Sequence, residues 1–173
     1  MTENRDKEMA ALFLDFSRQR LIEGFWPRLR TSVEPLTQEQ IWWRPNEASN
    51  SIGNLILHLN GNVGQYLVDS FEHKEDHRNR PAEFAATGGL SAAELLTRLG
   101  ATMDAAAKVL SRLTAENLLQ PMSIQGNHVT GLYAVYQVVE HFGQHYAQIV
   151  YIAKSLTGKD LGFFRALNKT GRP

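Results

Sequence analysis

The feature that most constrains the fold is a long run of helical periodicity near the end of the chain. From Thr130 to Leu156, apolar residues recur at the three- and four-residue spacing of one face of an α-helix. About 27 residues with a rise of 1.5 Å each give a helix about 40 Å long. Gly158 follows the segment and is typical of a helix end. The sequence therefore predicts one long amphipathic helix over residues 130–156.

Three further segments show helical periodicity, and no alternating strand pattern competes with them. They cover residues 4–30, 50–70 and 91–113. Gly24 and Pro27 are expected to kink or end the first helix. The apolar residues that define the face of this first helix are Met9, Leu12, Phe13, Phe16, Phe25 and Leu29. The sequence therefore predicts an all-α fold in which four long helices form a bundle.

The connections between these helices carry turn residues and charges. Residues 37–42 begin with a capping box and predict a short helical turn. Residues 72–90 are charged and then small, which predicts a solvated loop. His128 follows Gly126-Asn127 and is interpreted as a turn residue. No repeat or low-complexity segment suggests a second domain, so we expect residues 1–173 to form a single domain.

Charge balance and cysteine content argue against several classes of function. The chain has 18 lysines and arginines and 18 aspartates and glutamates, so we expect no binding to nucleic acid or anionic membranes. It has no cysteine, which leaves histidine and carboxylate as the strong metal ligands. The charged N-terminus lacks an apolar signal segment, and no apolar run is long enough to cross a bilayer. We therefore expect a soluble cytoplasmic protein.

Two histidines four residues apart are the strongest functional signal. His141 and His145 lie within the long helix predicted over residues 130–156, among the apolar residues of one face. Since one helical turn takes about 3.6 residues, the two imidazoles project from the same side and their nitrogens can converge on one ion. Zinc and similar divalent ions accept imidazole nitrogens at about 2.0–2.1 Å. His58, in the second predicted helix, would supply a third ligand if packing brings it opposite the pair.

Polar residues accompany these histidines. Asn54 and Asn62 lie one turn before and one turn after His58, and Gln148 lies three residues after His145. Small polar groups beside a metal in a mostly apolar pocket orient a substrate, so these three residues are the candidate substrate-binding groups. On a helical wheel His58 falls at the edge of its apolar stripe, where half-exposed histidines are common.

Simpler interpretations remain open at this point. His141 and His145 would serve equally as core histidines held neutral by hydrogen bonds. A second pair with the same spacing, His73 and His77, lies in the charged segment 72–90. The lysine and arginines of that segment repel a cation and a loop holds no rigid geometry, so we expect no metal site there.

Several segments together carry a resemblance to a known group of proteins. The longest are residues 51–62, Ser-Ile-Gly-Asn-Leu-Ile-Leu-His-Leu-Asn-Gly-Asn, and residues 141–154, which begin His-Phe-Gly-Gln-His-Tyr-Ala-Gln. With Trp43-Arg44-Pro45, Arg80-Pro81-x-Glu83-Phe84 and Gln125-Gly126, they resemble the DinB/YfiT-like superfamily, and most of all a subgroup of uncharacterised bacterial proteins.

This resemblance implies a four-helix bundle with one long crossover connection, often a homodimer. It also implies a three-histidine site for nickel or zinc, which falls on His58, His141 and His145. Better-understood relatives transfer low-molecular-weight thiols or isomerise substrates with a thiol, and others are regarded as hydrolases. We therefore expect a metal-dependent enzyme for a small-molecule substrate, of the hydrolase or thiol-transferase type. The alternative is a stress-related binding module with a structural or vestigial metal site.

Overall fold

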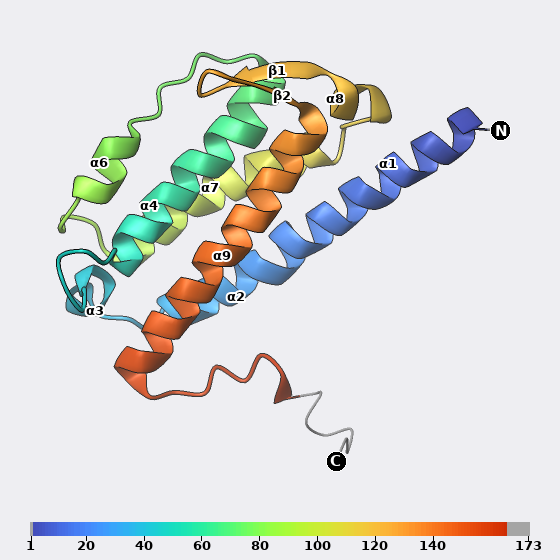
Figure 1. The fold of residues 1–173 in the computed structure, drawn as a ribbon. Helices are drawn as coiled ribbons and strands as arrows, with labels where there is room; N and C mark the ends of the chain where they lie inside the picture. Colours follow the sequence, from blue (N-terminus) through green and yellow to red (C-terminus); the bar gives the residue numbers. More distant parts are fainter. Residues whose placement is uncertain (1, 166–173) are drawn as a thin grey trace.

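The computed structural model describes residues 2–165, in which four long helical segments pack as a bundle (Figure 1). The first comprises α1 (Thr2–Arg18), η1 (Gln19–Phe25) and α2 (Trp26–Val33). The second comprises α4 (Ile52–Val63), η2 (Gly64–Asp69) and α5 (Ser70–Glu72). The third is α7 (Ala92–Leu110) and the fourth is α9 (Gly131–Thr157). The predicted all-α bundle is confirmed.

The first long helix continues through the residues that were expected to end it. Gly24 and Pro27 do not end the helix, because the helical backbone runs on to Val33. The segment before Pro27, Gln19–Phe25, is a π-helix. Pro27 has no main-chain N–H to donate, and it falls in the first turn of α2, where its fixed φ suits a helix.

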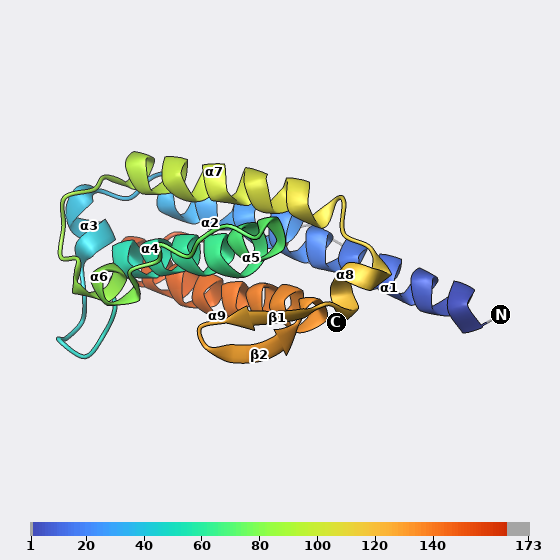
Figure 2. The same cartoon turned by 90° about the horizontal axis from the view of Figure 1, so that it is seen from above.

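The predicted buried face of the first helix is wrong in its N-terminal half. Met9, Leu12 and Phe16 are 70%, 50% and 59% exposed, while Leu14 and Leu21 are buried. Figures 1 and 2 show the reason, since the N-terminal part of α1 extends past the other helices. An apolar stripe at helical spacing is thus left uncovered on α1.

The connection before α4 contains the short helix α3 (Gln38–Trp42), as its capping box predicts. Thr37 and Gln40 cap each other's backbone N–H groups. The Trp42 indole Nε1–H donates a hydrogen bond to the carbonyl of Leu90 at 2.8 Å. Its ring lies so close to Gly53 that a Cβ there would come within 2.8 Å of it. Trp42 therefore joins the start of α4 to the segment before α7.

The charged segment 72–90 is not entirely a loop, and that prediction is wrong over α6 (Arg80–Ala85). The Asn79 side chain accepts a hydrogen bond from the main-chain N–H of Ala82 and caps this helix, and Pro81 occupies its first turn. Both are helix-start signals, but they are followed by only six helical residues, too few to show a periodicity. Figure 1 places α6 beside the N-terminal half of α4.

The connection before α9 contains the helix α8 (Ala115–Leu119) and a small β-hairpin that the sequence did not predict. Strand β1 (Pro121–Ile124) pairs antiparallel with β2 (Asn127–Thr130) (Figure 2). The turn residues Gln125 and Gly126 have φ values of 53° and 76°, as in the tight turns that favour two-residue hairpins. His128 lies on β2 opposite Ser123 and is not a turn residue.

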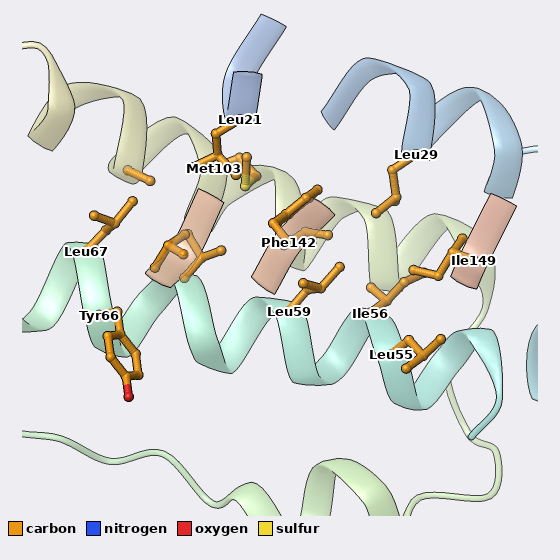
Figure 3. Packing of buried hydrophobic residues seen from close by; sticks show 14 of the residues in the cluster. Leu21, Leu29, Leu55, Ile56, Leu59, Tyr66, Leu67, Met103, Phe142 and Ile149 are labelled. Carbon is orange, nitrogen blue, oxygen red and sulfur yellow. The ribbon is translucent and has the colours of Figure 1, made fainter. Parts of the chain in front are cut away.

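A continuous hydrophobic core lies between the four long segments (Figure 3). The largest completely buried side chains come from every segment and include Leu29, Ile56, Leu59, Met103 and Phe142. No helix in residues 2–165 is both long and apolar enough to span a bilayer. The core fixes α4 against α9, and this contact positions the site described next.

Candidate metal centre

The candidate ligands come from two long helices that run in opposite directions (Figure 1). His58 lies in the middle of α4, and His141 and His145 lie one turn apart on α9. His141 and His145 are partly buried, whereas His58 is only 4% exposed. The expectation that His58 is half-exposed is wrong, because α6 covers that side of α4.

The three imidazoles converge on one point. One ring nitrogen from each lies within 4.8 Å of the others, and the Nε2 atoms of His58 and His141 are 2.8 Å apart. Ring centroids are 5.0, 5.0 and 4.4 Å apart, and the rings stand nearly perpendicular to one another. Nitrogens that share a tetrahedral ion at about 2.0–2.1 Å are about 3.3 Å apart, so a small relaxation would admit an ion.

His58 is oriented by Glu83, which comes from α6. The Nδ1 of His58 lies 2.9 Å from Oε2 of Glu83. Nη2 of Arg78 lies 3.0 Å from the same Nδ1. A guanidinium nitrogen can only donate, and this one also donates to Oε2 of Glu83 at 2.9 Å. Because an ionised carboxylate can only accept, we assign the proton to Nδ1 of His58, which donates to Glu83. This tautomer leaves Nε2 as an acceptor, and Nε2 of His141 lies 2.8 Å from it.

Arg78 and Glu83 form a buried ion pair behind His58. Two guanidinium nitrogens of Arg78 donate to the two carboxylate oxygens of Glu83, at 2.7 and 2.9 Å. Burial raises the pKa of Glu83, but the hydrogen bonds from Arg78 and His58 outweigh it and hold the pKa below its ordinary value. Glu83 is therefore an anion and a permanent acceptor for His58.

Gly61, one turn after His58, makes room for this ion pair. A Cβ at this position would lie 2.1 Å from Oε1 of Glu83 and 2.7 Å from Nε of Arg78. Real Cβ atoms do not approach other atoms so closely, so any larger residue would push the carboxylate away from α4. The absence of a side chain at Gly61 is thus part of how the site is built.

His141 and His145 are held in the neutral form that a metal requires. Nδ1 of His145 lies 2.8 Å from Oε1 of Gln148, an acceptor that fixes the proton on Nδ1 and leaves Nε2 free. Burial, and then the neighbouring His145 and His58, lower the pKa of His141 to about 4. Burial also lowers the pKa of His145. With the proton of His58 on Nδ1, the 2.8 Å contact between the Nε2 atoms of His58 and His141 places a proton on Nε2 of His141, which a bound ion would displace. Three imidazoles are ligands that zinc, nickel and related divalent ions accept.

The three candidate substrate-binding residues differ in their hydrogen-bond partners. Asn54 Oδ1 accepts from Ser51, and its Nδ2 donates to the carbonyls of Glu83, Phe84 and Ala86, so this side chain anchors α6 on α4. Gln148 accepts from His145. Asn62 is 3% exposed, and its Oδ1 has no hydrogen-bond partner in the described structure. Substrate contact by Asn54, Asn62 and Gln148 stays a prediction.

The remaining histidines do not join the cluster. Within residues 2–165, the three residues His58, His141 and His145 are the one group of histidines and carboxylates close enough to share an ion. His73 ends α5 with a left-handed backbone, and both His73 and His77 are exposed.

A large hollow lies on the other side of the ion pair. It has a volume of about 940 Å³ and runs between α4, η2, α7 and the segment that leads into α6. Arg78 and Glu83 line it, but the three histidines do not. The ion pair thus separates this cleft from the histidine nitrogens.

Sequence reasoning found the three histidines but gave no role to Gly61, Arg78 or Glu83. Glu83 and Phe84 belong to the Arg80-Pro81-x-Glu83-Phe84 segment that carried part of the family resemblance. That resemblance was the signal in the sequence that could have indicated Glu83. The composition of the surrounding residues 72–90 predicts only a loop. Only the packing of α6 on α4 shows that this segment completes the site.

The chain matches known proteins at the level of a family and of a fold. The profile of the family DUF1572, described as a protein of unknown function, matches residues 8–167. A conserved protein from Enterococcus faecalis has a similar crystal structure, with a TM-score of 0.61 and 16% identity, over 88% of this chain and 98% of that one. A DinB-like protein from Bacillus cereus gives a TM-score of 0.59 and 15% identity, over 81% and 95%. No curated protein matches the chain.

The structural matches show that the chain shares its helical-bundle fold with a DinB-like protein, the fold that the resemblance in its sequence implied. The chain belongs to the DUF1572 family, since the family profile covers most of its length. The identities to the two crystal structures are low, so those two likenesses concern the fold.

Proposed function

We propose that the protein is a metal-dependent enzyme in which His58, His141 and His145 hold one divalent ion, nickel or zinc. The observation that carries this proposal is the convergence of three neutral imidazoles, two of which have their outer nitrogen fixed by Glu83 or Gln148. Core histidines need only hydrogen-bond partners. A carboxylate behind a ligand histidine is instead the arrangement that raises its basicity toward a metal.

The residues around the cluster suit an open coordination position. Three protein ligands with a free fourth position are typical of catalytic zinc, whereas structural zinc sites have four protein ligands. In the described residues no fourth histidine or carboxylate joins the group. A bound ion would act as a Lewis acid, which lowers the pKa of bound water to about 7 or holds a thiol as its thiolate.

The chain itself would keep this centre neutral and rigid. Glu83 keeps the proton of His58 on Nδ1, and Gln148 does the same for His145. His141 stays neutral above pH of about 4, because burial opposes its protonation. The reaction we propose is hydrolysis, or the transfer of a low-molecular-weight thiol, on a small-molecule substrate.

The test is metal content and activity of tag-free protein purified without a chelator. We expect about one nickel or zinc ion per chain by mass spectrometry, lost in His58→Ala and in His141→Ala. The metal-loaded protein should then turn over a member of a panel of esters and thiol acceptors. Absence of metal even after reloading would overturn the metal site. Metal without turnover would favour the alternative below.

The alternative is a binding module whose metal site is structural or vestigial. It is favoured by the position of the large cleft beside the ion pair, which the three histidines do not line. In that case chelation should unfold the protein, because metal binding energy would be folding energy. For an enzyme, chelation should leave the bundle folded and abolish turnover.

We further propose that the protein forms a homodimer through the uncovered stripe of α1. Met9, Leu12 and Phe16 are exposed on one face of this helix, at spacings of three and four residues. Light scattering should give the mass of a dimer for the wild-type protein. A triple substitution of these residues by serine should give a monomer, and a wild-type monomer would disprove the proposal.

A further inference from the structure

Helix α6 brings two residues besides Glu83 to the metal centre. The ring of Phe84 lies 4.6 Å from the ring of His58, centroid to centroid, at an angle of 42°. The guanidinium carbon of Arg80 lies 5.0 Å from the centroid of Phe84. The cation, the aromatic ring and the imidazole thus follow one another in space, and Phe84 holds Arg80 by a cation–π contact.

The two arginines of this region differ in their partners. Arg78 is neutralised by Glu83 and is buried at its head group. Arg80 is exposed, and among the residues that the structure describes no carboxylate lies within ion-pair distance of it. Phe84 is the side chain that lies against both the Arg80 guanidinium and the His58 ring.

A divalent ion at this centre would attract negatively charged ligands. Three neutral imidazoles leave both charges of a divalent ion uncompensated. Glu83, the carboxylate that contacts His58, is already paired with Arg78. A negative group in the open position of the ion would therefore be favoured, and a second negative group near Arg80 would be favoured by the same argument.

We propose that Arg80 binds a carboxylate of the substrate while another group of the same molecule occupies the open metal position. Guanidinium binds carboxylate through two parallel hydrogen bonds, so Arg80 would fix the orientation as well as the charge of the substrate. This inference rests on the proposed metal site and extends it. The substrate class is a small carboxylic acid whose metal-binding group lies a few bonds from the carboxylate.

The test compares two small thiols on protein loaded with Co²⁺, whose thiolate complexes absorb in the near ultraviolet. The thiols are 3-mercaptopropionate and 3-mercaptopropan-1-ol, which differ in the presence of the carboxylate. We expect the wild-type protein to bind the acid about tenfold more tightly than the alcohol. In Arg80→Gln the two affinities should become equal, through loss of affinity for the acid alone. Arg80→Lys should keep part of the preference.

Arg98→Gln is the matched control, because Arg98 is also an exposed arginine but lies on α7, beside the large cleft. This variant should keep the full preference for the acid. Equal affinities in the wild-type protein, or a preference that survives Arg80→Gln, would overturn the role of Arg80 and leave the metal site standing. Failure to bind Co²⁺ at all would overturn both proposals together.

Discussion

Two pairs of histidines in this chain have the same four-residue spacing and very different surroundings. His141 and His145 lie on a long helix that packs against α4, so their rings meet His58. His73 and His77 lie after the end of α5, where the backbone turns left-handed and the side chains face solvent. A spacing of four residues places two imidazoles on the same side only where both residues belong to one continuous helix. A rigid opposing helix and a neutral environment distinguish the two pairs.

The largest expected difference between the pairs is in metal binding. His145→Ala should reduce the metal content from about one ion per chain to near zero, because two ligands bind far more weakly than three. His77→Ala should leave the metal content unchanged. Mass spectrometry after reloading with zinc or nickel and desalting measures both. Equal loss in the two variants would show that the ion binds elsewhere.

Glu83 is the second difference, because the exposed pair has no buried carboxylate behind it. Glu83→Gln keeps the shape of the side chain but removes the charge that orients His58. We expect the affinity for zinc to fall by about 10- to 100-fold, as for other carboxylates behind a ligand histidine. Competition with a coloured chelator measures this affinity. Glu75→Gln, beside His77, is the control and should have no effect.

Substitutions of two glycines on the same helical segment test whether the Arg78–Glu83 pair needs the space beside Gly61. Gly61→Ala would force the Arg78–Glu83 pair away from α4, and we expect it to destabilise the protein by about 1–3 kcal/mol and to weaken metal binding. Gly64→Ala meets nothing nearer than 3.9 Å and should leave stability unchanged or raise it by up to about 1 kcal/mol. Urea unfolding of the metal-free proteins measures both changes. Equal stabilities would contradict the packing described here.

The smallest expected effect is the pH dependence that burial of His141 creates. The pKa of His141 is about 4 in the folded protein and 6.5 when unperturbed, so the unfolded chain binds more protons between these values. Stability of the metal-free protein should therefore fall as the pH drops below 6.5, by on the order of 1 kcal/mol at pH 5. His141→Gln should flatten this dependence. Urea unfolding at pH 7 and pH 5 measures it, and an equal slope in both proteins would disprove it.

The helices and their first residues were predictable because the interactions that begin a helix are local in sequence. The capping boxes at Thr37, Ser51 and Ser91 satisfy main-chain N–H groups within three residues, and each begins a helix in the structure. The pairing of His141 with His145 follows from the geometry of one turn. The hairpin at Gln125 and Gly126 was missed, since its strands are only four residues long and too short to show an alternating pattern.

The sequence by itself therefore determined the bundle, the limits of its long helices and the side of α9 that carries two histidines. Only the tertiary structure decided that His58 is buried and that α6 lies over it. The contact between His58 and Glu83 spans 25 residues, and its carboxylate comes from a segment whose composition favours a loop. Charged groups are buried there because Arg78, Glu83 and His58 satisfy one another in the space above Gly61. No local preference encodes such an arrangement, since burial of a charge is favourable only when all its partners are in place.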